Sequence, residues 1–152
     1  MLLVCIIGFI WFLVRDVNFY PAQASTVHPK VPEIITPENK MAYDNWEEGR
    51  ILYKSYCASC HNPTRNSLGP ILAGATMRWK HAGSFKDKTG IEWMRMWIRN
   101  WKDAVNAGYP YAIQMARSRE AEMNFFMNLT DKQIDLIMSY ADNPDQFPRI
   151  DN

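Results

Sequence analysis

The residues most able to do chemistry in this chain lie together in one short stretch. Cys57 and Cys60 are separated by two residues, and His61 follows directly. Two thiols at this spacing can add across the two vinyl groups of a haem as thioethers, and the adjacent imidazole then reaches the iron. The same pair of thiols could also form a redox dithiol or half of a zinc site.

The rest of the sequence argues against both alternatives. A thioredoxin-like dithiol belongs to a βαβ context, and no segment here alternates apolar and polar residues for more than a few positions. A four-ligand zinc site needs two further ligands, but only Cys5, His28 and His81 remain, and they are scattered along the chain. We therefore expect one haem c, attached covalently through Cys57 and Cys60.

Three helices are expected to position this motif. Asp44, with Glu47 three residues later, predicts the start of a helix that runs into Cys57. Capping boxes predict two more helices, one beginning at Thr89 with Glu92 and one at Thr130 with Gln133, and the last should end near Pro144. With no strand pattern, the sequence predicts an all-α domain.

An apolar stripe at helical spacing follows the first capping box. We expect it to face the core, although one of its rings could also touch a buried cofactor. The stripe consists of Ile91, Met94, Trp97, Ile98 and Trp101.

The segments outside this domain have different compositions. Residues 1–20 are predicted to form a membrane anchor helix, with a cleaved signal peptide or a lipid-anchored Cys5 as alternatives. Residues 21–43 contain four prolines and are predicted to form a tether, or in part a coil on the domain surface. The domain itself is expected over 44–143, followed by a tail over 144–152.

Charge is distributed unevenly along the chain. The net charge is only +1, but residues 61–119 carry +7 and residues 120–152 carry −5. This distribution predicts a polarised surface whose basic side would meet an acidic face on a partner protein. It is too weakly basic to suggest nucleic acid binding.

The motif and its surroundings resemble class I c-type cytochromes over residues 44–143. The shared features are Gly49 and Tyr53 in the helix before the motif, and Gly69-Pro70 after it. The resemblance implies a class I cytochrome c fold in which the last helix crosses the first at Gly49, with an aromatic residue, here Tyr140, filling the angle. It also implies that the Pro70 carbonyl accepts a hydrogen bond from His61.

The same resemblance implies His61 and Met123 as the axial iron ligands. In the family, Met-Pro-x-Phe precedes Leu-Ser/Thr-Asp at the last helix, and here Met123 is followed by Asn124 instead of proline. Met127 and Met115 are the alternative ligands. Trp79 could donate its indole N–H to a haem propionate or simply pack in the pocket. Its neighbours Arg78 and Lys80 are propionate partners or solvated charges.

Residues 70–113 are similar to monohaem cytochrome domains of Bacteroidetes-type respiratory chains, which occur with alternative complex III or fused to oxidase subunits. This implies an electron-transfer subunit, not itself an enzyme, that relays electrons from a quinol-oxidising complex towards a terminal oxidase. Its partners would be other subunits of that complex and haem or iron–sulfur proteins. The domain would lie on the periplasmic side of the cytoplasmic membrane. An alternative is a peroxidase-like or gas-binding haem protein with a labile methionine, and another is a structural subunit.

Overall fold

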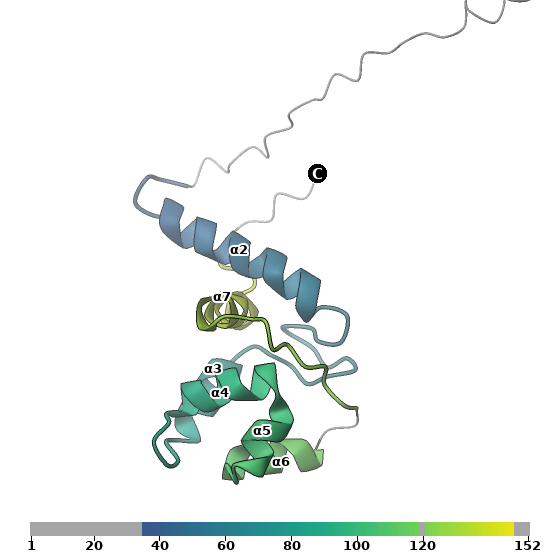
Figure 1. Cartoon of the computed structure of the whole chain (residues 1–152). Helices are drawn as coiled ribbons and strands as arrows, with labels where there is room; N and C mark the ends of the chain where they lie inside the picture. The colour runs from purple at the N-terminus through teal and green to yellow at the C-terminus, as the bar shows by residue number, and fades with distance from the viewer. Residues whose placement is uncertain (1–34, 119–120, 148–152) are drawn as a thin grey trace, which may run out of the picture. The chain divides into compact units, whose positions relative to one another are not determined.

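The helix that ends at the two cysteines is α2, Lys40–Tyr56 (Figure 1). The structure is a computed structural model that describes residues 35–118 and 121–147, all of which belong to one unit, Pro32–Asn152. The predicted start at Asp44 is wrong, because the helix begins four residues earlier, with Asn39 as the N-cap residue. Asp44 lies one turn into the helix and forms an ion pair with Lys40 at 2.6 Å instead of capping.

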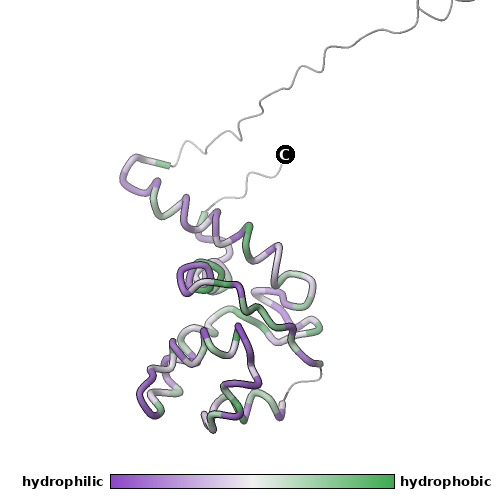
Figure 2. Tube along the Cα trace, in the orientation of Figure 1, coloured by the Kyte–Doolittle hydropathy of each residue, from purple (hydrophilic) through white to green (hydrophobic). Residues whose placement is uncertain are grey.

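Helix α7, Asp131–Asp142, packs across α2 (Figure 1). At the crossing, a Cβ on Gly49 would lie less than 3.0 Å from the backbone of Leu136, so only glycine allows the two backbones to approach this closely. The Tyr140 ring lies between those of Trp46 and Tyr53, with centroids 5.5 and 5.3 Å away. The expected crossing at Gly49 and Tyr140 is confirmed. Along α2, Figure 2 shows hydrophilic residues interrupted by hydrophobic ones, as an amphipathic helix requires.

Both predicted capping boxes are present. Thr89 caps α4, Gly90–Arg99, with Glu92, and Thr130 caps α7 with Gln133. The apolar stripe of α4 is core, as expected, since Met94 and Trp97 are buried. The predicted continuation through Trp101 is wrong, because Asn100 ends α4 and caps the next helix, α5, Trp101–Asn106.

Besides α5, two further short helices were not expected from the sequence. Helix α3, Ala75–His81, follows Gly74, which adopts a left-handed conformation and offers no side-chain cap. His81 is the last residue of this helix. Helix α6 comprises Pro110–Ser118. Helices α3 to α6 lie together below α7 in Figure 1, and α3 packs on α4.

The domain is all-α, as predicted, and within the described ranges the only strand-like pairing is an isolated bridge between Phe85 and Lys88. Phe147 packs against Tyr43 and Trp46, so the first part of the predicted tail covers α2.

No helix in the described part of the chain is long and apolar enough to cross a membrane. The predicted anchor over 1–20 and most of the predicted tether lie outside the described residues.

Candidate haem site

The two cysteines lie on a turn that continues directly from the end of α2. The backbone N–H of Cys57 donates to the Tyr53 carbonyl at 2.8 Å, and the N–H groups of Cys60 and His61 both donate to the Cys57 carbonyl, at 3.1 and 2.8 Å. Both cysteines are half-buried free thiols. The helix end therefore presents the two thiols and the imidazole from a single tight turn.

The imidazole of His61 is held against the backbone of the next loop. Its Nδ1 atom lies 3.0 Å from the carbonyl oxygen of Pro70. Since a carbonyl can only accept, Nδ1 must carry the proton in this hydrogen bond, which leaves the Nε2 lone pair available for a metal. The expected contact between His61 and Pro70 is present.

Gly69 makes this position of the imidazole possible. A Cβ at residue 69 would lie less than 3.0 Å from three atoms of the His61 ring. The ring therefore packs directly against Gly69, in space that the side chain of any other residue would occupy. The Gly69 N–H donates to the Cys60 carbonyl at 2.7 Å, and the Tyr53 hydroxyl donates to the His61 carbonyl at 2.6 Å. The loop after the motif is thus tied back to the motif itself.

The thiol of Cys57 is not activated as a nucleophile by its surroundings. Burial raises the pKa of the Cys57 thiol to about 12, with a smaller contribution from the neighbouring Cys60. The thiol of Cys57 is therefore protonated at neutral pH, unlike a redox-active dithiol, whose nucleophilic cysteine has a lowered pKa. A raised pKa at Cys57 is unfavourable for dithiol exchange.

The segment that carries Met123 is tied to the junction between α4 and α5. The Met123 carbonyl accepts a hydrogen bond from the indole Nε1–H of Trp101 at 3.2 Å. Further along, the Phe126 N–H donates to the Arg99 carbonyl at 2.9 Å, and the Arg99 Nε donates to the Leu129 carbonyl at 2.8 Å. The contacts of Trp101 and Arg99 with this segment were not expected, because only the fold brings these residues to it.

The other methionine candidates occupy different surroundings. Met123 is half-buried against the core, whereas Met127 is 62% exposed. Met115 belongs to α6 and is also half-buried against the core.

Trp79 is a core residue, only 4% exposed. Its ring contacts Trp97, Tyr109 and Tyr111, with centroids 4.9 to 5.9 Å apart.

The guanidinium of Arg78 donates to the carbonyls of Ile71 and Ala73, at 2.9 and 2.8 Å, so it braces the loop that follows Pro70. Lys80 is exposed.

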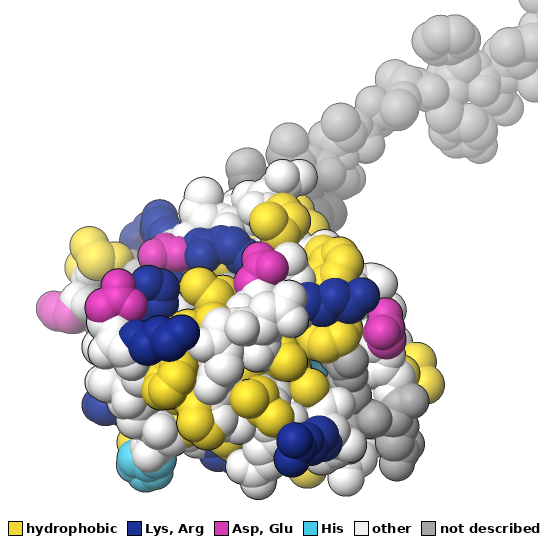
Figure 3. Space-filling view, turned by 60° about the horizontal axis from the view of Figure 1, so that its bottom comes forward, with side chains coloured by type: hydrophobic (Ala, Val, Ile, Leu, Met, Phe, Trp, Pro, Cys, Tyr) yellow, Lys and Arg dark blue, Asp and Glu magenta, His cyan; other side chains and the backbone are white. Residues whose placement is uncertain are grey.

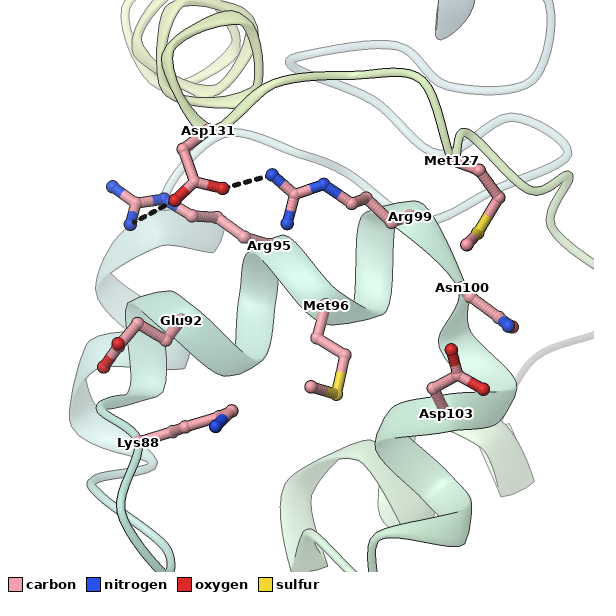
Figure 4. A pocket seen from close by; sticks show the side chains of 9 residues that line it. All are labelled: Lys88, Glu92, Arg95, Met96, Arg99, Asn100, Asp103, Met127 and Asp131. Atoms are coloured by element: carbon pink, nitrogen blue, oxygen red, sulfur yellow. Dashed lines mark hydrogen bonds and ion pairs between the residues drawn. The ribbon is translucent and has the colours of Figure 1, made fainter.

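A surface groove of about 310 Å³ lies beside α4, and no residue of the cysteine motif lines it (Figure 4). Figure 4 shows the guanidinium groups of Arg95 and Arg99 on either side of Asp131, with which both form ion pairs. Met127 also lines this groove, so its exposed thioether lies over α4. The groove combines three basic and three acidic residues and shows no preference for a ligand of either charge.

Taken together, an all-α fold with two thiols and an oriented imidazole on one turn defines a c-type cytochrome domain. A family model described as "Cytochrome C oxidase, cbb3-type, subunit III" matches residues 44–140, and the chain belongs to this family. It is therefore a haem-bearing electron-carrier domain related to that oxidase subunit.

Comparison with solved structures gives a further similarity. A cytochrome c from Rhodothermus marinus has 21% sequence identity and a TM-score of 0.48, over 73% of this chain and 84% of that one. No curated protein matches the sequence.

Proposed function

We propose that this chain is a monohaem electron-transfer subunit of a membrane respiratory complex, with Cys57 and Cys60 attaching the haem and His61 and Met123 as axial ligands. The observation that carries the proposal is the His61 imidazole, fixed on Gly69 with Nδ1 bonded to the Pro70 carbonyl. This arrangement selects the tautomer whose Nε2 binds iron. It would be unnecessary in a dithiol or a purely structural domain.

The residues of the chain then have separate tasks. Haem, when bound, supplies an iron that alternates between ferric and ferrous and so holds one electron. Cys57 and Cys60 keep the cofactor from dissociating, and the bond to Pro70 raises the basicity of His61 as a ligand. A thioether from Met123 favours the ferrous state and raises the reduction potential. If both His61 and Met123 bind the iron, no position would remain open for a substrate, which would favour electron transfer over ligand chemistry.

The structure supports Met123 over the other methionines by where their side chains lie. Met123 is half-buried against the core and its backbone is hydrogen-bonded to Trp101. Met127 lies in the exposed groove beside α4, and Met115 is part of a regular helix. Of these three candidates, only Met123 combines an irregular backbone with a partly buried position.

Trp79 is proposed to contribute to cofactor binding by packing. Its contacts with three aromatic rings support a role as a rigid part of the haem-pocket wall. Because the Arg78 guanidinium already binds two backbone carbonyls, we assign Arg78 to bracing the Pro70 loop.

The test of this proposal is replacement of Met123 by leucine in the haem-loaded protein. The wild-type protein should show the sulfur-to-iron charge-transfer band of the ferric state and should not bind carbon monoxide rapidly when reduced. Met123→Leu should lose the band, lower the reduction potential and bind carbon monoxide. Met127→Leu is the matched control and should behave as the wild type. Rapid carbon monoxide binding by the wild-type protein would instead favour the gas-binding or peroxidase-like alternative.

For the partners, we propose subunits that deliver electrons from quinol oxidation and accept them towards a terminal oxidase, through haem or iron–sulfur centres. The relation to a cbb3-type oxidase subunit supports a respiratory complex.

We further propose that residues 1–20 anchor the chain in the cytoplasmic membrane, with the haem domain on the periplasmic side. Purification in mild detergent should yield co-migrating subunits that contain such cofactors. Recovery of the protein without redox partners would contradict this assignment.

A further inference from the structure

A short run of residues at the junction of α4 and α5 contacts most of the segment that carries Met123. The backbone carbonyl of Arg99 accepts a hydrogen bond from Phe126, and its side chain donates one to the Leu129 carbonyl. The Arg99 guanidinium also forms an ion pair with Asp131. Trp101 donates to the Met123 carbonyl, and the Lys102 ammonium lies 5.5 Å from the centre of the Phe125 ring. The junction thus contacts the segment from Met123 to the start of α7.

Trp101 is the member of this junction that reaches Met123 itself. Its side chain is 7% exposed, and its indole Nε1–H donates to the Met123 carbonyl at 3.2 Å. The Trp101 ring contacts the Trp97 ring, with ring centroids 6.3 Å apart. The Lys102 ammonium also lies 5.3 Å from the centre of the Trp101 ring. A donor fixed in this way holds its acceptor at low cost in conformational entropy.

The residue after Met123 makes an external anchor necessary. Asn124 is exposed and, unlike proline, does not fix its own backbone φ angle. The segment therefore lacks a rigid residue beside Met123. Its backbone position depends instead on hydrogen bonds from elsewhere in the fold, and the bond from Trp101 is the one made at Met123.

We propose that Trp101 is a positioning residue for the Met123 ligand: its indole N–H anchors the Met123 backbone so that the thioether stays directed at the haem iron. This inference rests on the proposed ligation by Met123. Trp101 touches the carbonyl of Met123 and acts through that residue. Loss of one such hydrogen bond should make displacement of the thioether by an added ligand roughly threefold to tenfold more favourable.

The test compares Trp101→Phe with Trp93→Phe in the haem-loaded protein. Phenylalanine keeps an aromatic ring and removes the N–H donor. Trp93 is the matched control, because it is also buried and its Nε1–H donates to the Phe85 carbonyl at 3.1 Å. Both variants remove an indole-to-carbonyl hydrogen bond, but only one of these bonds reaches Met123. The readouts are the ferric sulfur-to-iron band, the pH at which it disappears, and the affinity for imidazole.

With Trp101→Phe, the band should disappear at lower pH and imidazole should bind roughly threefold to tenfold more tightly than in the wild type. Trp93→Phe should leave both quantities unchanged. Identical behaviour of the two variants would overturn the inference while leaving ligation by Met123 intact. If the wild-type protein lacks the band, ligation by Met123 fails, and the inference fails with it.

A second measurement applies if Trp101→Phe does not fold. Coupling between two sites is reciprocal, so loss of the iron–sulfur bond must loosen the Trp101 hydrogen bond. In the reduced protein, Met123→Leu should accelerate hydrogen exchange at the Trp101 indole N–H and leave that of Trp93 unchanged. Equal exchange rates at Trp101 in the wild type and in Met123→Leu would contradict the inference.

Discussion

Gly69 determines how closely the His61 imidazole can lie against the loop that orients it. The ring occupies the space that a side chain at residue 69 would need, and Nδ1 then reaches the Pro70 carbonyl at 3.0 Å. A Gly-Pro pair thus has two functions at adjacent positions. Pro70 supplies the carbonyl that accepts the hydrogen bond from His61, and Gly69 leaves the space that the imidazole ring occupies.

Replacement of Gly69 by alanine should displace His61. The added Cβ would lie less than 3.0 Å from three ring atoms, so the imidazole or the loop must shift. Overpacking of this kind costs about 1–3 kcal/mol. We expect a lower melting temperature of the haem-loaded protein and a changed low-spin ferric spectrum, both measured by absorbance.

Gly83→Ala is the control for this variant. Gly83 has a φ of +82° with no atom within 4 Å of an added Cβ, so its substitution tests backbone strain alone. It should cost about 1–2 kcal/mol and leave the ferric spectrum unchanged. If Gly69→Ala has a wild-type spectrum, the steric role of Gly69 is refuted.

At the scale of elements, the turn that bears the cysteines continues from α2, and α2 is held in place by its crossing with α7. Gly49→Ala should destabilise the domain even though alanine is the better helix former by about 1 kcal/mol. The reason is that the added Cβ would lie less than 3.0 Å from the Leu136 carbonyl, a backbone group that cannot move without its helix. We expect a net loss of about 1–2 kcal/mol by chemical denaturation. Ser55→Ala, at an exposed position of the same helix, should change stability by less than about 0.5 kcal/mol.

Ion pairs connect α4 to the start of α7 and predict a pH dependence. The hydrogen bond from Arg99, together with the charges of Arg99 and Arg95, lowers the pKa of Asp131. A lowered folded-state pKa stabilises the fold above the unfolded pKa, near 3.8, and that stability is lost as the pH falls through the folded value. Asp131→Asn should therefore be less stable than the wild type at neutral pH and equal to it in strong acid.

The expected difference at neutral pH is no more than about 1 kcal/mol, since the Asp131 side chain is largely exposed. Thermal unfolding measured across the acidic range provides the check. Glu48→Gln, which removes an exposed carboxylate from α2, is the control for loss of charge alone. A stability difference that persists below the folded pKa would refute the ion-pair explanation.

How far the sequence predicts these elements depends on whether their signals are local. The capping boxes at Thr89 and Thr130 act within one turn, and they locate the starts of α4 and α7 correctly. Helix α3 begins at a left-handed glycine without a cap, so its formation depends on packing against α4. Helix α6 does carry a local signal, because Pro110 stands at its first position.

The same distinction applies to the site. The contact between His61 and Pro70 spans nine residues of one loop, and it was expected from the resemblance of Gly69-Pro70 to class I c-type cytochromes. The bond from Trp101 to Met123 joins residues 22 positions apart in different elements. Neither residue type nor spacing indicates that pairing. Only the placement of the α4–α5 junction beside the Met123 segment reveals it.

At the scale of the whole molecule, charge is segregated along the chain around the haem-binding motif. No Asp or Glu occurs between Glu48 and Asp87, a stretch that contains both cysteines and the loop after them. Figure 3 shows one face of the domain, where hydrophobic side chains gather across the middle and both basic and acidic side chains lie around them. A stretch that carries basic residues and no acidic ones attracts anions locally even though the net charge of the chain is only +1.

This local charge predicts how electron-transfer rates depend on salt. Oxidation of the reduced protein by the hexacyanoferrate(III) anion should slow as ionic strength rises, and oxidation by a cationic cobalt complex should accelerate. Arg65 is exposed and four residues from His61, so Arg65→Glu should weaken the salt dependence with the anion. Lys132→Glu makes the same charge change on α7, whose flanking sequence is acidic, and should have little effect. If the two variants respond alike, net charge alone controls the rate, and the basic stretch around the motif does not steer electron-transfer partners.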